Sequence, residues 1–148
     1  MDQVDRSLLA ELQADGRLSF NELSRRVHLS SPAVAERVRR LEETGTLTGY
    51  HAHVDTRQVG WPVLALVLMD CYGPRCVLQD EQLLAWPKIL EVHRVTGEHC
   101  SLLKVVGTSI EDYEQTVDRL GSAGPLSSMM VLSSPLPWRA VEPPPAEG

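Results

Sequence analysis

The sequence contains no uninterrupted apolar run near the roughly 18 residues that a membrane-spanning helix needs. It also has only three cysteines, Cys71, Cys76 and Cys100, which form no CxxC pair and are too scattered for a disulfide framework. Its first residues, MDQVDRS, are acidic and lack the basic-then-apolar pattern of a secretory signal peptide. We therefore expect a cytoplasmic protein with reduced thiols and no membrane partner.

An excess of positive charge is missing as well, since the formal net charge is -6 at pH 7. Most of the acidic surplus lies in the second half of the chain. Between Arg25 and Arg40, by contrast, five arginines stand against a single acidic residue, Glu36. Local charge steers an approaching polyanion more than net charge does, so the overall acidity does not exclude a nucleic-acid partner. The length of 148 residues suits one ordinary domain or two small ones.

Three short helices with clear start and stop signals are predicted before Gly45. The first begins at Asp2 and ends at an Asp-Gly stop, with an apolar face at helical spacing. The second begins with SFNE, a capping box in which Ser19 and Glu22 exchange hydrogen bonds between side chain and backbone. The expected inner face of this second helix consists of Phe20, Leu23 and Val27.

The third predicted helix follows a tight turn at His28 and Leu29. Ser30 or Ser31 caps it, and Pro32 suits its first turn because no amide hydrogen is needed there. Two helices joined by a short turn are the geometry of a helix-turn-helix, whose second helix enters the major groove of double-stranded DNA. The apolar stripe that should pack against the first two helices consists of Val34, Val38 and Leu41.

The arginines of the third helix are candidate contacts for DNA phosphates or guanine. At roughly 100° per residue, Arg39 and Arg40 face away from the apolar stripe, whereas Arg37 lies on its shoulder and could instead pair within the domain. The competing interpretation is that these arginines only form a solvent-exposed charged face of the helix and pair with Glu42 and Glu43. The turn, the caps and the local charge together favour DNA contact. The predicted DNA-binding residues are Ser30, Ser31, Ala33, Arg37, Arg39 and Arg40, with Arg25 and Arg26 of the preceding helix.

The N-terminal half of the chain resembles the Lrp/AsnC (feast/famine) family of transcription regulators. The resemblance runs through DRSLLAELQADGRLSFNELSRRVHLSSPAVAERVRRLEETGTLTGYHAHVDTRQVG and includes a hinge strand after the helix-turn-helix. It departs from the family at His28, where glycine is usual, so this residue must tolerate a left-handed or adjusted backbone. In the hinge, Tyr50, Ala52 and Val54 alternate with polar residues, as in a strand.

The second half predicts the order strand, helix, strand, strand, helix, strand, which is the ferredoxin-like βαββαβ arrangement. The expected fold is therefore α+β: a three-helix (winged) helix-turn-helix domain, a hinge strand, and a ferredoxin-like ligand-sensing and oligomerisation domain. Both faces of the first strand, PVLALVLMDCY, are apolar, which predicts burial of the open sheet face in a homodimer. The resemblance also implies a tetramer of dimers. The expected ranges are 1–48 for the DNA-binding domain, 49–61 for the hinge, 62–134 for the effector domain and 135–148 for a Pro-rich tail.

The loop TGEHCS joins the second and third predicted strands. In the resembling family this loop, commonly Gly-Asp-x-Asp, lies at a contact between dimers and helps to bind a small amino acid. Here Gly97 is retained, Glu98 stands for the first Asp, and Cys100 replaces the second. A carboxylate holds an α-ammonium by charge-assisted hydrogen bonds, which a neutral thiol cannot replace. The effector-binding residues that the resemblance implies are Thr96, Gly97, Glu98, His99 and Cys100, with an amino acid as effector and no cofactor.

Two further features indicate function less specifically. His93, His99 and Cys100, with the pair His51 and His53, could ligate a metal, but their spacing is not diagnostic and we expect none. The tail SSPLPWRAVEPPPAEG should be extended or disordered. It could be recognised by a proline-binding domain, or it could pack its tryptophan on a neighbouring subunit.

These features predict a transcriptional regulator that binds specific DNA sequences and is controlled by a small amino acid or a related metabolite bound at subunit interfaces. The alternative is an enzyme, because siroheme decarboxylases share the two-domain build; the hinge TGYHAHVD looks more like that of the regulators. A third interpretation is an assembly factor with an inert helix-turn-helix. Fold alone does not separate these functions.

Overall fold

The computed structural model describes residues 1–70 and 76–144. The chain divides into two compact units, which are described separately. The first unit comprises residues 1–53 and 136–148, and the second comprises residues 54–135. The first division thus falls between His53 and Val54, inside the segment expected to be a hinge.

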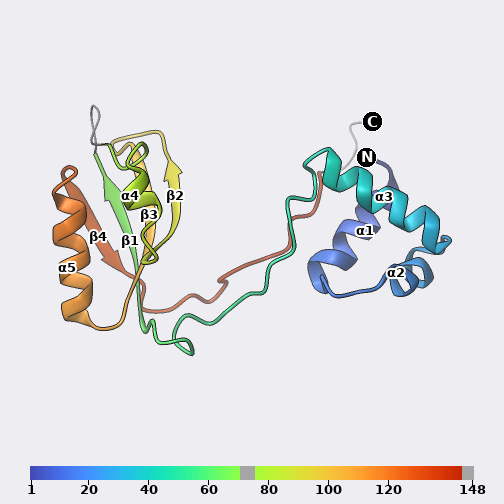
Figure 1. Cartoon of the computed structure of the whole chain (residues 1–148), viewed down its shortest axis with the longest axis horizontal. Helices are drawn as coiled ribbons and strands as arrows, with labels where there is room; N and C mark the ends of the chain where they lie inside the picture. The colour runs from blue at the N-terminus through green and yellow to red at the C-terminus, as the bar shows by residue number, and fades with distance from the viewer. Residues whose placement is uncertain (71–75, 145–148) are drawn as a thin grey trace. The chain divides into compact units, whose positions relative to one another are not determined.

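The first unit is built on three helices, which Figure 1 shows in blue and cyan: α1 (Gln3–Ala14), α2 (Phe20–Val27) and α3 (Ser31–Glu43). The predicted caps are confirmed at Asp2, Ser19 and Ser30, and the capping box between Ser19 and Glu22 is present. A buried core joins the three helices, as their apolar faces predict. This core consists of Leu8, Leu12, Leu23, Val34 and Val38.

The turn between α2 and α3 depends on His28. Its backbone is left-handed, with φ 55° and ψ 43°, and it is the one non-glycine residue with positive φ in the described chain. The expected left-handed turn is therefore confirmed. The expectation for Phe20 is wrong, since this side chain is 46% exposed. Phe20 is the first residue of α2, next to the cap, and the core is already filled by Leu23 from the following turn.

No strand forms in residues 49–61, so the predicted hinge strand is not observed. A strand needs a partner for its backbone ladder, and no described strand pairs with this segment. Tyr50 instead anchors the segment to the end of α3, because its hydroxyl donates to Glu42 Oε1 at 2.9 Å. Burial, and then this hydrogen bond, raises the pKa of Tyr50 to about 12.

The tail beyond Leu136 has no regular secondary structure in its described part, but it is attached to α1. The side-chain amide of Gln13 donates to Val141 O at 3.0 Å, and its oxygen accepts from Val141 N at 2.8 Å. Arg6 donates to the carbonyls of Pro143 and Pro144 at 3.0 and 2.6 Å. The sequence did not predict this attachment.

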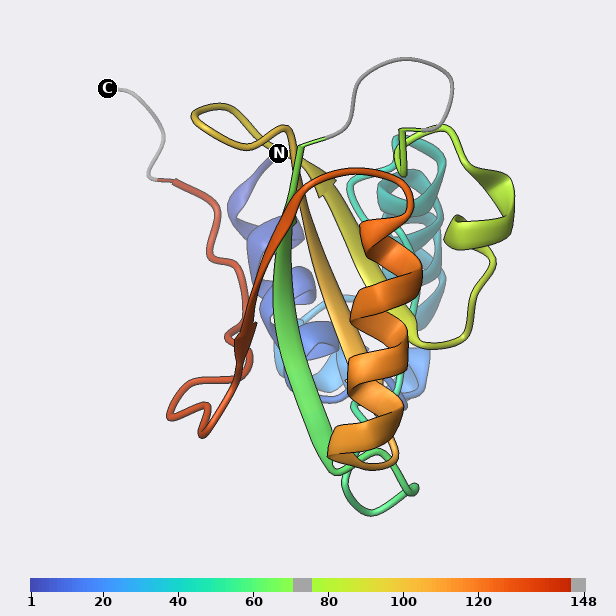
Figure 2. The same cartoon turned by 90° about the vertical axis from the view of Figure 1, so that its left-hand side faces the viewer.

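The described residues of the second unit form four strands and two helices in the predicted βαββαβ order. They are β1 (Val63–Met69), α4 (Glu81–Leu84), β2 (Ile89–Arg94), β3 (Ser101–Gly107), α5 (Ile110–Gly121) and β4 (Leu126–Met130). The sheet order is β2-β3-β1-β4 with every neighbouring pair antiparallel. Figure 2 shows α5 in front of the sheet and α4 at its right-hand edge, and Leu83 of α4 and Leu120 of α5 pack in one core with β1.

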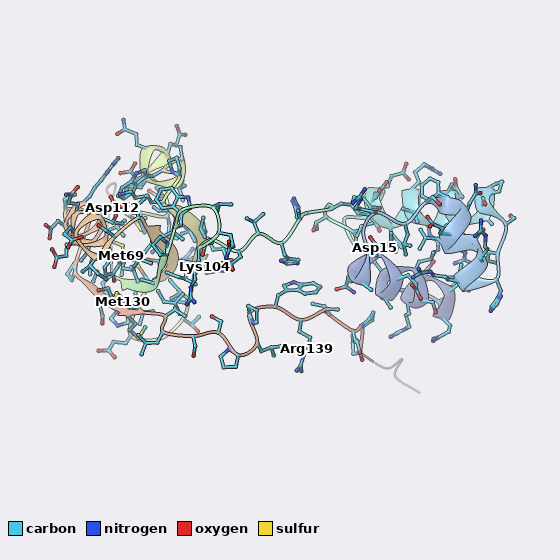
Figure 3. The ribbon with its side chains drawn as sticks, turned by 90° about the horizontal axis from the view of Figure 1, so that it is seen from below. Asp15, Met69, Lys104, Asp112, Met130 and Arg139 are labelled. Carbon is cyan, nitrogen blue, oxygen red and sulfur yellow. The ribbon has the colours of Figure 1, made fainter. Side chains whose placement is uncertain are left out.

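Strand register separates the two faces of the sheet. Ala65, Val67 and Met69 are fully buried and pack in a core with α5 residues such as Leu120. The side chains between them point to the other face, because successive residues of a strand alternate. We call this second surface the open sheet face; from the pairing register it includes the apolar Leu64, Leu66, Leu68, Leu102, Val106 and Met129 and the polar Lys104, Glu91, His93 and Ser127. Figure 3 shows Lys104 on the opposite side of the sheet from Asp112 of α5.

The cysteines differ from the prediction that all thiols are reduced. Cys76 is disulfide-bonded, so the prediction of reduced thiols is wrong for this residue. Cys71 lies outside the described residues. Cys100 lies just before β3, and its thiol donates to Met69 O at 3.3 Å.

Candidate functional site

The N-terminal end of α3 is fixed by hydroxyl groups. Ser30 Oγ accepts from Ala33 N at 3.4 Å and so caps the helix. Ser31 Oγ donates to Asn21 Oδ1 at 2.6 Å, which ties the first turn of α3 to α2. Ser30 is exposed and Ser31 and Ala33 are half-buried. Asn21, the second residue of α2, was not among the predicted site residues.

Arg37 and Arg40 are held by acidic residues of α1. Arg37 donates to Asp2 at 2.6 Å and to Asp5 at 2.7 Å, and Arg40 donates to both oxygens of Asp5 at 3.1 and 3.0 Å. Asp5 is only 2% exposed, and a buried carboxylate needs such partners. Hydrogen bonding to Asp2, and then to Asp5, raises the pKa of the Arg37 guanidinium. The internal pairing left open for Arg37 is therefore the arrangement observed, and Arg40 shares it although its side chain is 54% exposed.

Sequence reasoning missed Asp5 as the centre of this cluster. Asp5 lies three and four residues before Leu8 and Leu9, which are buried on the same helix. An acidic residue at that spacing on a buried helical face is itself a signal that a cation must reach it.

Arg25, Arg26 and Arg39 are exposed, as Arg40 is, but none of the three pairs with Asp5. Arg26 pairs with Glu11 of α1, and Arg39 pairs with Glu36 and Glu43 along α3. The pairing of Arg39 with Glu43 matches part of the solvated-helix interpretation. Exposed pairs of this kind contribute little to stability, so a DNA phosphate can displace them at small cost. Arg25 has no ion pair among the described residues.

We expect the double replacement Arg25→Ala and Arg39→Ala to weaken DNA binding and to leave folding nearly unchanged, because neither side chain supports the core. The slope of log affinity against log salt should become shallower by about 0.9 for each phosphate that is no longer neutralised. Fluorescence anisotropy with a labelled duplex over a salt series measures this slope. Arg17→Ala, an exposed arginine outside α2 and α3, serves as control. An unchanged slope in the double variant would remove both residues from the interface.

The loop between β2 and β3 presents part of its backbone to solvent. Thr96, Gly97 and Glu98 are exposed, whereas His99 and Cys100 are half-buried. Gly97 has φ 117°, a conformation that favours glycine, and a Cβ built on it would meet nothing within 4 Å. A small ligand can therefore approach the backbone at this position.

The second half of the loop is bound to the end of β1. Cys100 N donates to Met69 O at 3.2 Å, and the thiol of Cys100 and the hydroxyl of Ser101 both donate to the same carbonyl at 3.3 Å. His99 Nδ1 lies 3.2 Å from Asp70 Oδ2. The loop residues predicted to bind the effector therefore form an exposed tip and an inner half, and the inner half is hydrogen-bonded to the end of β1.

Besides His99, two of the candidate metal ligands contact other side chains. His93 lies 3.3 Å from Glu91, and the His53 ring lies 4.6 Å from that of Trp138. Within residues 1–70 and 76–144, no three His, Cys, Asp or Glu side chains gather in an arrangement that could hold a metal ion. Over the same ranges, no helix combines the length and the apolar character needed to cross a bilayer.

Comparison with known proteins gives consistent matches over both halves of the chain. An AsnC-type helix-turn-helix domain model matches residues 1–42, and an Lrp/AsnC ligand binding domain model matches residues 79–141. The HTH-type transcriptional regulator YezC of Bacillus subtilis is 38% identical over 134 residues, which cover 90% of this chain and 95% of that protein. HTH-type regulator LrpC of the same organism is 34% identical over 80% of this chain and 83% of its own length.

Solved structures agree in fold. The structure of B. subtilis LrpC matches with a TM-score of 0.86 at 30% identity, covering 93% of this chain and 99% of that one. The feast or famine regulatory protein of M. tuberculosis, complexed with L-methionine, matches with a TM-score of 0.86 at 30% identity over 96% of this chain and 99% of that one. These relatives are named as regulators and share both the three-helix unit and the βαββαβ unit. The chain therefore belongs to the Lrp/AsnC family of helix-turn-helix transcriptional regulators.

Proposed function

We propose that this regulator binds specific double-stranded DNA sequences through α3 and that an amino acid or related metabolite controls this binding. The observation that carries the proposal is the N-terminal end of α3, where Ser30 caps the helix and Ser31 is tied to α2; exposed arginines lie on α2 (Arg25) and farther along α3 (Arg39). Small side chains at such an end leave base reading to hydroxyl groups and to DNA shape, while arginines bind phosphate. Because chromosomal DNA is the target, the proposed compartment is the cytoplasm.

In this proposal Arg37 and Arg40 have a different function from that expected from the sequence. Their hydrogen bonds to Asp5 hold α3 on α1, so their main role is to orient the DNA-reading helix. Arg40 is exposed enough to contact a phosphate in addition. Arg26, which pairs with Glu11, belongs to the same set of secondary phosphate contacts.

The proposed assembly is a homodimer formed through the open sheet face, with further association into a tetramer of dimers. Three leucines of β1 and Met129 of β4 supply an apolar surface on this face, and Met129 is 48% exposed in the single chain. Exposed apolar surface of this kind favours association. A two-fold dimer also presents two helix-turn-helix units to two half-sites of an operator.

The proposed effector site includes Thr96, Gly97, Glu98, His99 and Cys100. Two related regulators, from M. tuberculosis and from Neisseria meningitidis, have been solved with L-methionine, which supports an amino acid as the effector class here. Binding at a contact between subunits would shift the populations of assemblies that differ in DNA affinity. No catalytic step and no cofactor are part of the proposal.

A thermal-shift screen of the full chain with the twenty standard amino acids tests this function. A ligand at a hundred times its dissociation constant should stabilise the folded state by about 2.7 kcal/mol. The expected result is a raised melting temperature with one or a few amino acids, and a changed affinity for DNA with the same compounds. A protein that responds to none of the twenty would contradict the proposed effector class.

Within the loop, we expect Glu98→Gln to weaken binding of the amino acid by about 1 kcal/mol, the difference between a charged and a neutral hydrogen bond. Cys100→Ser should change it less, because the Cys100 thiol is directed to Met69 O. Isothermal titration calorimetry measures both, and DNA affinity without effector should stay the same. If Glu98→Gln bound every amino acid normally while Cys100→Ser bound none, a thiol-based sensor would replace this proposal.

A further inference from the structure

Asp70 is a partly buried carboxylate whose hydrogen-bonding capacity is mostly unused. It follows β1 directly, and its side chain is 26% exposed. Its Oδ1 is buried and has no hydrogen-bond partner among the described residues. Its Oδ2 lies 3.2 Å from His99 Nδ1. An ionised carboxylate has about four acceptor positions, and here a single side-chain contact is made.

Leaving such a group unpartnered costs folding free energy, so it calls for a reason. No lysine or arginine in residues 1–70 or 76–144 forms an ion pair with Asp70. The backbone does not require an acidic side chain at this position, since Asp70 N simply donates to Pro125 O at 3.0 Å. The carboxylate is therefore not explained by the packing of the fold.

The position of Asp70 connects it to the effector loop. The neighbouring residue, Met69, accepts hydrogen bonds from the backbone and the thiol of Cys100 at 3.2 and 3.3 Å. His99 then spans from the loop to Asp70 itself. Asp70 thus lies beside the inner half of the loop whose exposed tip carries Glu98.

We propose that Asp70 is a second carboxylate of the effector site and that it receives the α-ammonium of the bound amino acid together with Glu98. The inference rests on the proposed amino-acid effector. An ammonium group has three N–H donors and is best held by more than one anionic acceptor. Asp70 supplies the acceptor that the neutral Cys100 thiol does not. His99 acts as a positioning residue, since its ring holds Oδ2 in place.

A ligand-binding role and a purely structural role of Asp70 predict different melting temperatures for Asp70→Asn. If the function of Asp70 is to bind a ligand, its unpartnered carboxylate destabilises the ligand-free protein. Asp70→Asn should therefore raise the melting temperature measured without effector, or leave it unchanged. The same variant should bind its amino acid about tenfold or more weakly, because a charged acceptor is replaced by a neutral one. A residue that only supports the fold would lower the melting temperature when replaced.

The experiment compares the wild-type full chain, Asp70→Asn and the control Asp118→Asn, which removes the same charge from an exposed position on α5. Each of the twenty standard amino acids is the probe, in thermal-shift assays followed by calorimetry of those that bind. Weaker binding by Asp70→Asn alone, with an undiminished melting temperature, supports the proposal. Equal binding by wild type and Asp70→Asn, or a variant that melts lower than wild type, overturns it while the proposed function stands. A wild type that binds no amino acid overturns both.

Discussion

Leu66→Asp should convert the protein from dimers to monomers and leave the effector domain folded. Leu66 lies in the centre of the open sheet face, where it pairs with Lys104 of β3 and Met129 of β4. In a two-fold dimer the substitution places one carboxylate per subunit in the interface, and the facing Lys104 is already bound to Glu91, so burial of the new charges is strongly unfavourable. We expect the dimer dissociation constant to rise about a hundredfold or more, with a comparable loss of affinity for a two-half-site operator.

Light scattering and circular dichroism of the same samples separate assembly from folding. Leu84→Asp is the matched control, since Leu84 is an exposed leucine on α4 and its replacement should leave both unchanged. Val67→Asp should instead unfold the domain, because Val67 is fully buried between the sheet and the helices. A Leu66→Asp protein that remains dimeric would show that the open face is not the interface.

The second large effect concerns the cluster around Asp5. Replacing Arg37 and Arg40 together with alanine leaves the Asp5 carboxylate buried without a cation. Removing the cations that pair with a buried carboxylate is strongly destabilising, and a small domain has little stability to lose. We expect the helix-turn-helix unit to unfold at much lower temperature or denaturant concentration, and DNA binding to be lost with it.

Arg39→Ala provides the comparison, because it removes an arginine of the same helix that does not pair with Asp5. Arg39 is exposed and pairs only with exposed carboxylates, so its removal should weaken DNA binding while stability changes little. Chemical denaturation followed by helical circular dichroism measures the difference. Equal stability of the two variants would mean that Asp5 does not depend on these arginines.

The elements of this protein were predictable wherever local signals were strong. Ser19 with Glu22 and Ser30 with Pro32 mark helix starts by their own chemistry, and the structure confirms both. The alternation of Ala65 with Leu66 also predicted a strand with two apolar faces. The hinge strand at Tyr50 failed because alternation describes a strand only when another strand pairs with it.

The side-chain network was less predictable, because it depends on contacts between elements. The spacing of Arg40 from the apolar stripe predicted a side chain directed away from the other helices, whereas the packing of α1 against α3 brings the buried Asp5 within its reach. The sequence around Asp70 does not indicate that this residue contacts His99. The contact forms because the end of β1 lies against a loop 29 residues later in the chain. The attachment of Gln13 to the tail spans 128 residues and likewise has no local signal.

The most direct test of the account is the salt dependence of DNA binding by the full chain, measured on a duplex that the protein selects from a random-sequence pool. We predict that a defined sequence is enriched and that log affinity falls linearly with log salt, with a slope of about 0.9 per neutralised phosphate. The Arg25→Ala and Arg39→Ala variant should show the shallower slope. A pool from which no sequence is enriched, with no duplex bound even at low salt, would contradict the claim that α3 is a DNA-reading helix.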